Sequence, residues 1–406
     1  MKEIVETLRV PVKAPVDVIV AGGGFAGVAA ALAARRCGAD VLLLEKTASL
    51  GGLGTNGLIS YYEPLCDGQG EQLMGGIAEE LLHASIRYGD DTLPQIWVDR
   101  SGPADKSLVR PEKKDPIGGR YAALFSPTLC QLALDELLVH AGVQIRFDIL
   151  VARPVAENGR LLGLMCESKS GREYFPASAF VDATGDADLF YRANCECVNG
   201  ENYFTSIAHC STVSEKKKAL QNRQWLVCGA DLYGKGHPAG YPKMSGTTNE
   251  EISRFILDGR KAILDKVRQE DRTGRDIVAL PGQAQFRKTR RIKGAYTITE
   301  KDLKHPQPDS IGVVGDFNKP GDWYEIPYGC LYAPALENVF AAGRMISADG
   351  WAWDVTRVIP VCCLTGQAAG TAAAFIARRN CTAADLPLNE LQDRLTQQGV
   401  RLHKNP

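Results

Sequence analysis

Three glycines near the start of the chain have the spacing of a loop that binds phosphate groups. Gly22, Gly24 and Gly27 form a GxGxxG pattern, and Glu45 follows 21 residues after the second of them. In such a loop the first glycine makes a tight turn, the second lets backbone approach a pyrophosphate, and the third lets a helix pack closely on a strand. A carboxylate at that distance can accept hydrogen bonds from ribose hydroxyls. The pattern therefore predicts a dinucleotide site.

The segments around these residues predict the elements that must position them. The apolar run 17–21 predicts a parallel strand buried on both faces, residues 25–36 predict a helix, and 41–44 predict a second strand. The N-terminus of that helix offers free N–H groups and partial positive charge to the phosphates. We expect further contacts from residues beside the motif: Phe25, Ala26 and Lys46.

Beyond the acid, the chain resembles FAD-dependent oxidoreductases of the glutathione-reductase-like superfamily, distantly related to the fumarate reductase flavoproteins. The resemblance depends on the double glycine 51–52 and on LGTNG at 53–57, an extension that an NAD site does not need. Small residues there would let the chain pass alongside an extended ribityl–flavin. The resemblance implies non-covalent FAD, contacted here by Gly51, Gly52, Gly54, Thr55 and Asn56.

Two later segments resemble the same superfamily. FVDATGDADL, residues 180–189, predicts a strand end followed by a turn. In NVFAAGR, residues 338–344, positions 339–342 predict a last parallel strand. Ligands of open α/β sheets bind at the carboxyl ends of such strands. The resemblance implies FAD contacts from Ala183, Thr184, Gly185, Asp186, Gly343 and Arg344, and a backbone contact to adenine from Val151.

The segment after that strand predicts a long helix. Pro360 suits its first turn, where a missing N–H costs nothing. Relatives point the N-terminus of this helix at the flavin pyrimidine, where its dipole stabilises negative charge. We therefore expect Val358 and Ile359 to contact the cofactor. Small residues lie on one face of the helix, which leaves a purely packing role as the alternative: Gly366, Ala369, Gly370 and Ala373.

These segments together predict an α/β fold, a Rossmann-like FAD-binding domain of the glutathione-reductase type with an inserted α+β substrate cap. The FAD-binding domain is expected to be discontinuous, and the cap to fill the gaps. The predicted FAD-binding domain comprises residues 1–61, 120–197 and 324–406. The predicted cap comprises residues 62–119 and 198–323.

Within the predicted cap, apolar periodicity indicates a helix over 75–89, near the flavin, and an amphipathic helix over 249–272. Residues 99–119 predict a polar loop. The GVVG at 312–315 lacks strand–turn–helix context, so we expect no separate NAD(P)H domain.

Five residues are candidates for the chemistry beside the flavin. Arg290 and Arg291 could hold a carboxylate or an enolate-like oxygen, or they could form ordinary ion pairs. Asp354 and Arg357 precede the long helix and should face the flavin ring. Tyr324 could donate a proton or line the pocket, or it could be a core residue.

Other residue types argue for or against particular mechanisms. Only six histidines exist and none falls in the matched flavin segments, which disfavours a histidine base or a histidyl–flavin bond. Cys362 and Cys363 lie in the first helical turn, where a thiolate would be stabilised, but no CxxC pair supports a disulfide reductase. Trp351 and Trp353 could stack on a substrate ring, or simply pack.

The composition bounds the class of protein. With 406 residues, 45% hydrophobic and 23% charged, the chain suits two domains, or one with an insertion. A net charge of −1 gives no reason to expect nucleic acid or an anionic membrane surface. We expect no membrane span and no secretory signal, hence a cytoplasmic protein whose twelve scattered cysteines are reduced, with no metal site.

The function predicted from these features is hydride transfer between a small organic substrate and flavin N5. The electron donor or acceptor is unidentified, and homo-oligomerisation stays open. Two alternatives are a biosynthetic flavoprotein of the tRNA-modifying or thiazole-forming kind, and a non-catalytic FAD-binding redox sensor.

Overall fold

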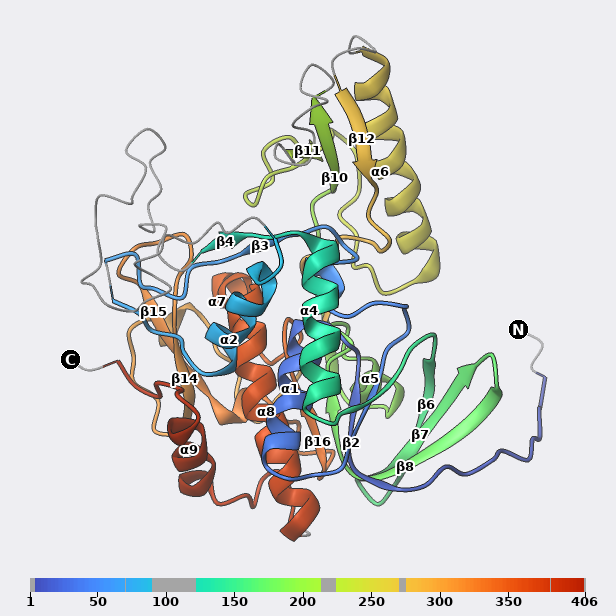
Figure 1. The fold of residues 1–406 in the computed structure, drawn as a ribbon, viewed down its shortest axis with the longest axis vertical. Helices are drawn as coiled ribbons and strands as arrows, with labels where there is room; N and C mark the ends of the chain where they lie inside the picture. Colours follow the sequence, from blue (N-terminus) through green and yellow to red (C-terminus); the bar gives the residue numbers. More distant parts are fainter. Residues whose placement is uncertain are drawn as a thin grey trace.

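A computed structural model describes residues 4–69, 71–89, 122–212, 224–269, 275–379 and 381–404. It shows an α/β body with one smaller module that projects from it (Figure 1). The predicted polar loop at 99–119 lies outside the described residues.

The body is organised around five parallel strands. Their order is β5 (Gln144–Arg146), β2 (Val41–Leu44), β1 (Val16–Ala21), β8 (Gly171–Asp182) and β16 (Val339–Ala341). Every residue of β2 and β16 is buried, as expected of strands with layers on both faces. The predicted first, second and last parallel strands are therefore confirmed, each within one residue.

Strand β8 is long enough to belong to two pairings. Its second half pairs in parallel with β1 and β16, while its first half pairs antiparallel with β7 (Arg160–Ser168). Strand β7 pairs in turn with β6 (Leu150–Glu157). Asn158 and Gly159 both have positive φ, 49° and 80°, which is the backbone that a two-residue hairpin requires.

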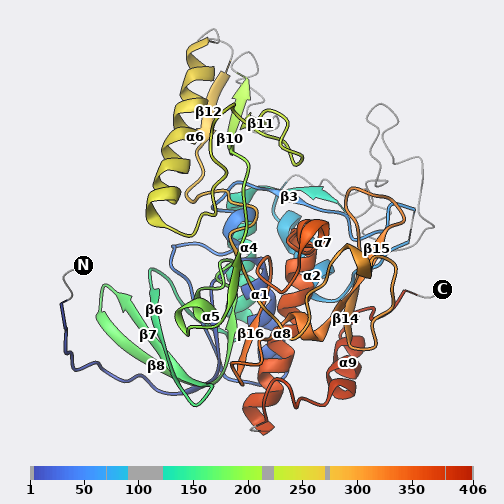
Figure 2. The same cartoon turned by 180° about the vertical axis from the view of Figure 1, so that it is seen from behind.

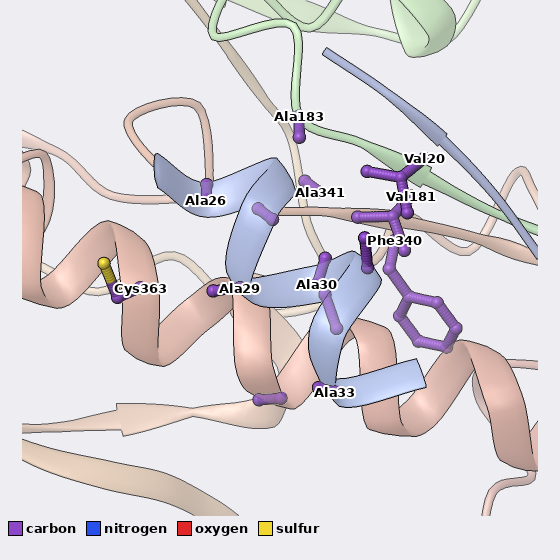
Figure 3. Close-up of a cluster of buried hydrophobic side chains, with 14 of the residues drawn as sticks. Val20, Ala26, Ala29, Ala30, Ala33, Val181, Ala183, Phe340, Ala341 and Cys363 are labelled. Carbon is purple, nitrogen blue, oxygen red and sulfur yellow. The ribbon is translucent and has the colours of Figure 1, made fainter. Parts of the chain in front are cut away.

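Helix α1 (Phe25–Arg36) lies against helix α8 (Ile359–Arg379) at close range (Figure 3). A Cβ on Gly366 would come within 3.0 Å of the Ala26 carbonyl oxygen, and one on Gly370 would come equally close to that of Ala30. The small-residue face of α8 therefore packs on α1, and only glycine fits at these two positions.

Three further helices cover the body. Helix α4 (Pro127–His140) begins after Ser126, which is the N-cap residue but makes no side-chain capping bond. Helix α2 (Ile77–Ile86) packs on α4, α8 and α1, and helix α9 (Leu388–Gln397) packs on α8. The helix predicted at 75–89 exists, but it is part of the main core, with Leu81 fully buried.

The projecting module is a three-stranded sheet with one helix on it (Figure 2). Its strand order is β11 (Gln224–Gly229), β10 (Thr205–Thr212) and β12 (Arg275–Ala279). Helix α6 (Asn249–Gln269) packs on β10 and β11, which confirms the predicted amphipathic helix. Its buried residues recur every fourth position, as one helix face requires: Phe255, Gly259 and Ile263.

Shorter elements connect the module with the body. Strand β13 (Arg290–Ile292) pairs with β9 (Cys197–Asn199), and β3 (Tyr61–Tyr62) pairs with β4 (Ala123–Leu124). Two helices are short: α5 (Asp188–Arg192), which follows β8 in the chain, and α7 (Gly350–Thr356), which follows β16.

Strand β14 (Ser310–Gly315) pairs antiparallel with β15 (Trp323–Pro327). The GVVG segment is thus one strand of a hairpin, as its lack of motif context indicates. The domain boundary predicted at 323/324 falls inside β15, and it would separate most of this strand from its partner β14, which packs on α8 and α9. The division into FAD-binding and cap domains stays a prediction.

Two expectations drawn from the composition concern the cysteines and the absence of a membrane span. None of the twelve cysteines is joined in a disulfide, as predicted. In the described part of the chain, α8 alone is long and apolar enough to cross a membrane, judged by length and composition. Of the tested window, 83% is buried inside the protein, as in a core helix.

Candidate functional site

One cavity of about 390 Å³ lies at the carboxyl ends of the parallel strands. Four turns form its wall: residues 22–26 after β1, 44–46 after β2, 183–186 after β8 and 342–344 after β16. This is the edge at which open parallel sheets bind ligands. Residues 51–54 and the start of α8 complete this side.

Most of the predicted cofactor contacts are brought together here. Those that line the cavity are Gly22, Gly24, Phe25, Ala26, Glu45, Lys46, Gly51, Gly52, Gly54, Val151, Ala183, Thr184, Gly185, Asp186, Gly343, Arg344 and Ile359. Four predicted contacts are not part of the wall: Gly27, Thr55, Asn56 and Val358.

These four residues support the wall from behind. A Cβ on Gly27 would collide with the Gly22 carbonyl, so Gly27 sets the distance between helix and turn. The Thr55 hydroxyl donates to the Leu50 carbonyl at 2.5 Å. The carbonyl of Asn56 accepts a hydrogen bond from the backbone N–H of residue 282 at 2.9 Å, and Val358 is buried.

The glycine turn leaves a space that suits a pyrophosphate. Gly22 has a φ of 104°, and a Cβ there would come within 3.0 Å of the Ala183 carbonyl, so the turn needs glycine. A Cβ on Gly24 would meet nothing within 4 Å. Gly24 therefore faces open cavity space at the N-terminus of α1, where free N–H groups favour an anion.

Glu45 is held at the cavity wall by short hydrogen bonds. Its Oε2 accepts from the Gly23 N–H at 2.6 Å, and its Oε1 accepts from the N–H and hydroxyl of Thr47 at 2.7 and 2.8 Å. Oε2 has a further lone pair that can accept a bond, so a ribose hydroxyl can still be bound. The fixed orientation fits the predicted role.

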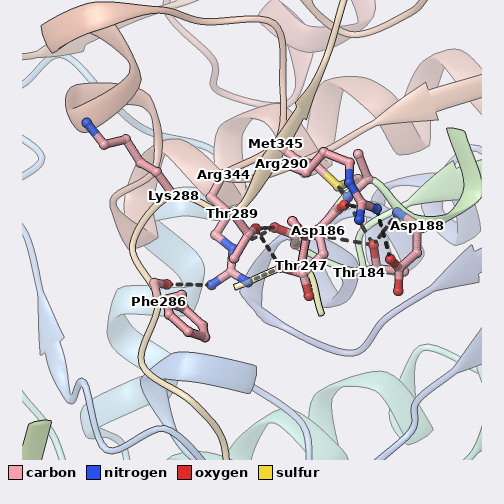
Figure 4. A network of polar contacts seen from close by, with 12 residues as sticks. Thr184, Asp186, Asp188, Thr247, Phe286, Lys288, Thr289, Arg290, Arg344 and Met345 are labelled. Carbon is pink, nitrogen blue, oxygen red and sulfur yellow. Dashed lines mark hydrogen bonds and ion pairs between the residues drawn. The ribbon is translucent and has the colours of Figure 1, made fainter. Parts of the chain in front are cut away.

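Arg344 connects three segments at the cavity (Figure 4). Its Nε donates to the Gly185 carbonyl at 2.6 Å, its Nη2 to Asp186 Oδ1 at 2.5 Å, and its Nη1 to the Phe286 carbonyl at 2.9 Å. Gly185 and Asp186 follow β8, and Arg344 follows β16. The guanidinium therefore joins two strand ends to the segment that carries Phe286.

The carboxyl of Asp186 is kept ionised in a buried position. Burial acts to raise its pKa, but the charges of Arg344 and Lys46 and the hydroxyl of Thr289 outweigh burial, and the pKa is lowered. Thr289 donates to Asp186 Oδ1 at 2.6 Å. An ionised Asp186 fixes Arg344, and both side chains define the wall between strand ends.

The opposite wall comes from a loop that we call the 282–289 strip. Gly282, Gln283, Ala284, Phe286 and Thr289 of this strip line the cavity. Residues from the projecting module add to it: Gly246, Ile252 and Ile256. The strip has neither hydrophobic periodicity nor a glycine motif, so no sequence pattern assigns it to the site. The cavity thus lies between strand ends and the 282–289 strip.

The two predicted arginines of β13 do not line the cavity. The guanidinium of Arg290 lies 3.8 Å from the ring centroid of Tyr191 and donates to the Asp186 carbonyl at 3.2 Å. Arg291 forms an ion pair with Asp349 at 3.5 Å. Both side chains therefore make intramolecular contacts, the alternative that the sequence left open, although the Nε of each is buried without a hydrogen-bond partner among the described residues.

Asp354 and Arg357 lie together at the start of α8, but only Arg357 lines the cavity. Asp354 Oδ1 accepts from Nε and Nη2 of Arg357 at 3.0 and 2.9 Å, and its Oδ2 accepts from Nζ of Lys288 at 2.8 Å. Asp354 therefore orients Arg357. Tyr324 is buried in β15 away from the cavity wall, and burial raises its pKa.

Glu63 is a residue that the sequence analysis does not identify. Its Oε2 accepts from the Ile359 N–H at 3.3 Å, at the N-terminus of α8. Burial raises the pKa of Glu63 to about 7, although the Ile359 N–H and the Arg357 charge oppose the rise. No sequence pattern marks Glu63, because about 300 residues separate it from its partners.

The cysteines and tryptophans at this end differ from expectation. Burial raises the pKa of Cys362 to about 12 and that of Cys363 well above its ordinary value. The expected stabilised thiolate is therefore wrong, because burial outweighs the helix terminus. Trp351 stacks on Phe317, and the Trp353 indole donates to the Arg344 carbonyl at 2.6 Å, so both tryptophans pack within the protein.

Comparisons with known proteins bear on the family. The family model described as FAD dependent oxidoreductase matches residues 17–239 and 209–395. No curated protein matches the sequence. Among solved structures, OxyS anhydrotetracycline hydroxylase from Streptomyces rimosus is similar, with 14% identity and a TM-score of 0.46 over 94% of this chain and 65% of that one, just under two thirds of its length.

A geranylgeranyl bacteriochlorophyll reductase-like protein from Thermoplasma acidophilum has 14% identity and a TM-score of 0.46, over 95% of this chain and 84% of that one. BexE has 14% identity and a TM-score of 0.48, over 95% of this chain and 69% of that one. Such similarity says nothing about this protein's substrate. The family model, by contrast, covers most of the chain, including every cavity-forming turn. The chain therefore belongs to the FAD dependent oxidoreductase family, whose redox cofactor is FAD.

Proposed function

We propose that this protein is an enzyme in which hydride passes between a carbon of a small organic substrate and flavin N5. The observation that carries the proposal is the cavity with two unlike walls. One wall consists of strand-end turns suited to a dinucleotide, and the other is the 282–289 strip with Ile252 and Ile256. A second wall of this kind leaves room for a substrate beside the cofactor.

The described residues fit FAD along the first wall. The Gly24 turn and the N-terminus of α1 would hold the pyrophosphate, and Glu45 would hold a ribose. Residues 149–151 would flank the adenine, and the start of α8 would lie at the flavin. When bound, FAD supplies the two-electron redox chemistry.

The chain's own groups would bind and orient the substrate. Phe286 and Leu53 give the cavity apolar surface that excludes water. Arg357, fixed by Asp354, presents a guanidinium to the cavity. Glu63, with its pKa raised to about 7 by burial, is partly protonated near neutral pH and could take or give a proton at its carboxyl oxygen.

We also propose a cytoplasmic enzyme without a dedicated NAD(P)H domain. In the described residues the second glycine-rich candidate, 312–315, is one strand of an antiparallel hairpin. An organic substrate, or NAD(P)H binding transiently, would therefore exchange electrons with the flavin.

The proposal is tested by purifying the protein and following its flavin absorbance. We expect a yellow protein that releases FAD on denaturation. Under anaerobic conditions, a panel of sugars, acids, amino acids and steroids should contain compounds that bleach the flavin. Protein that stays colourless after incubation with FAD would contradict cofactor binding. Retained FAD that neither reduces nor reoxidises with any small molecule would contradict the enzymatic proposal.

A further inference from the structure

Arg192 lines the cavity but is not among the residues that the sequence predicts to contact the cofactor. It is the last residue of the short helix α5. Its Nη1 donates to the Val151 carbonyl, and its Nη2 donates to Asp188 Oδ2 at 3.3 Å. The side chain is 32% exposed, so part of the guanidinium remains open to the cavity while two of its nitrogens are held by protein acceptors.

The position of Arg192 is the adenosine end of the cavity. The backbone N–H of Ile149 donates to the Glu45 carbonyl at 3.2 Å, so strand β6 begins beside the carboxylate that suits a ribose. Arg192 binds the carbonyl of Val151, two residues further along the chain. Residues 149–151 and Arg192 all line the cavity. Because adenine is attached to the ribose itself, a ribose at Glu45 places the base beside β6 and Arg192.

The guanidinium of Arg192 has a flat surface that suits a planar base. Arginine stacks on aromatic rings through the face of its guanidinium, whereas its edges make hydrogen bonds. In Arg192 the nitrogens Nη1 and Nη2 are bound to Val151 and Asp188, so the face is the main surface left for a ligand. Leu150, which lines the cavity and is 48% exposed, adds apolar surface for the base.

We propose that the guanidinium of Arg192 stacks on the adenine of FAD, and that Asp188 and the Val151 carbonyl hold it in position. This rests on the proposed placement of FAD along the strand ends, and it does not depend on the reaction. Arg192 is then a main reason for the protein to bind FAD more tightly than FMN, because FMN has no adenine. The contact depends on the planar guanidinium and not only on its charge.

Flavin binding to the full-length protein tests this without turnover. The bound flavin is removed, and FAD and FMN are then titrated separately into the wild type and into Arg192→Gln. Calorimetry reports both affinities, and an excess of FMN makes even weak binding measurable. We expect Arg192→Gln to weaken FAD by about tenfold, within the range of base-stacking contacts in proteins. The affinity for FMN should change less than twofold.

Arg192→Lys separates stacking from charge. Lysine keeps the positive charge and can still pair with Asp188, but it has no planar group. The affinity of this variant for FAD should therefore stay well below that of the wild type. Thermal melting without flavin shows whether each variant is folded. If Arg192→Gln unfolds because Asp188 loses its partner, Arg192→Lys carries the test, since it retains the ion pair.

The matched control is Arg160→Gln. Arg160 pairs with Glu337 at 3.6 Å, its side chain is 26% exposed, and it does not line the cavity. This variant therefore removes a similarly exposed arginine from a place that the cofactor does not reach. Its affinity for FAD should change less than twofold.

The proposal is overturned if Arg192→Gln binds FAD as tightly as the wild type, if FMN is weakened as much as FAD, or if Arg192→Lys binds FAD as tightly as the wild type. Each of these results leaves the proposed function standing, because flavin is still bound and a substrate can still reduce it. A protein whose FAD affinity depends on Arg192 as expected, but whose flavin no small molecule reduces, contradicts the proposed function alone.

Discussion

Arg344 and Asp186 form an ion pair with 2.5 Å between Nη2 and Oδ1, where two parallel strands of the sheet end. Arg344 follows β16 and Asp186 follows β8. The same guanidinium donates to the Phe286 carbonyl at 2.9 Å, so it also fixes the 282–289 strip. The two walls of the cavity are therefore joined by one side chain, and the shape of the cavity depends on a mostly buried ion pair.

Replacing Arg344 should destabilise the protein. Arg344→Met leaves the Asp186 carboxylate without its main partner, although Lys46 and Thr289 remain. The side chains of Arg344 and Asp186 are 15% and 25% exposed, so the pair is only partly shielded from water. We therefore expect a loss of about 2 kcal/mol in the free energy of unfolding, which is less than the ~3–5 kcal/mol lost when a fully buried pair is broken. Urea denaturation measures the loss.

The matched control for that variant is an exposed pair. Arg379 pairs with Glu390, and the side chains are 40% and 45% exposed. Arg379→Met should lower the free energy of unfolding much less than Arg344→Met, because water and salt screen exposed ion pairs. Equal losses in the two variants would show that burial of the Arg344–Asp186 pair contributes nothing.

Substitutions at two glycines of the GxGxxG motif should affect different properties, FAD affinity in one case and thermal stability in the other. Gly24 has φ −64° and ψ 175°, which any residue adopts, and its Cβ would meet no protein atom within 4 Å. Gly24→Val should therefore fold normally but bind FAD at least tenfold more weakly, since the side chain fills cofactor space. Gly27→Ala should lower thermal stability instead, because its Cβ collides with the Gly22 carbonyl. Flavin titration and thermal melting separate the two effects.

An unchanged FAD affinity in Gly24→Val would place the pyrophosphate elsewhere. Thermal stability as high in Gly27→Ala as in the wild type would mean that the turn can shift to accept a methyl group.

Replacing Gly366 in α8 by alanine tests the close contact with α1, because the melting temperature should fall if the helices are in contact and rise if they are not. Glycine to alanine inside a helix normally stabilises by about 1 kcal/mol. At Gly366 the new Cβ would come within 3.0 Å of the Ala26 carbonyl, and such overpacking costs about 1–3 kcal/mol. We therefore expect Gly366→Ala to lower the melting temperature. A higher melting temperature would show that α1 and α8 lie farther apart than in the structure.

Much of the fold follows from local sequence, and much of the site does not. The strand–turn–helix–strand order around Gly22 and Glu45 predicts β1, α1 and β2 within one residue, because spacing and periodicity act over short distances. The face of Gly366 and Gly370 is predicted for the same reason.

Tertiary contacts decide the remainder of the site. Glu63 meets the N-terminus of α8 only through the fold, where its carboxylate accepts from the Ile359 N–H. Lys288 of the 282–289 strip likewise reaches Asp354, 66 residues away in the chain. No periodicity connects such residues. Arg290 and Arg291 look equally suitable in the sequence, but strand β13 directs them to other partners.

Glu63 should make stability depend on pH near neutrality. Burial raises its pKa from 4.5 to about 7, so the folded protein favours the protonated carboxyl. Stability from this group is complete below pH 4.5 and is lost as the pH rises through about 7. Glu63→Gln cannot ionise, yet its amide oxygen can still accept from the Ile359 N–H.

We therefore expect wild type and Glu63→Gln to unfold with similar free energies at pH 5, and the variant to be more stable by about 2 kcal/mol at pH 8. Urea denaturation of the FAD-loaded proteins at both pH values measures this difference. Burial also raises the pKa of Asp182 to about 7. Asp182 titrates in both proteins, so its effect on stability cancels from the comparison. A difference that does not change between pH 5 and pH 8 would show that Glu63 is ionised throughout this range.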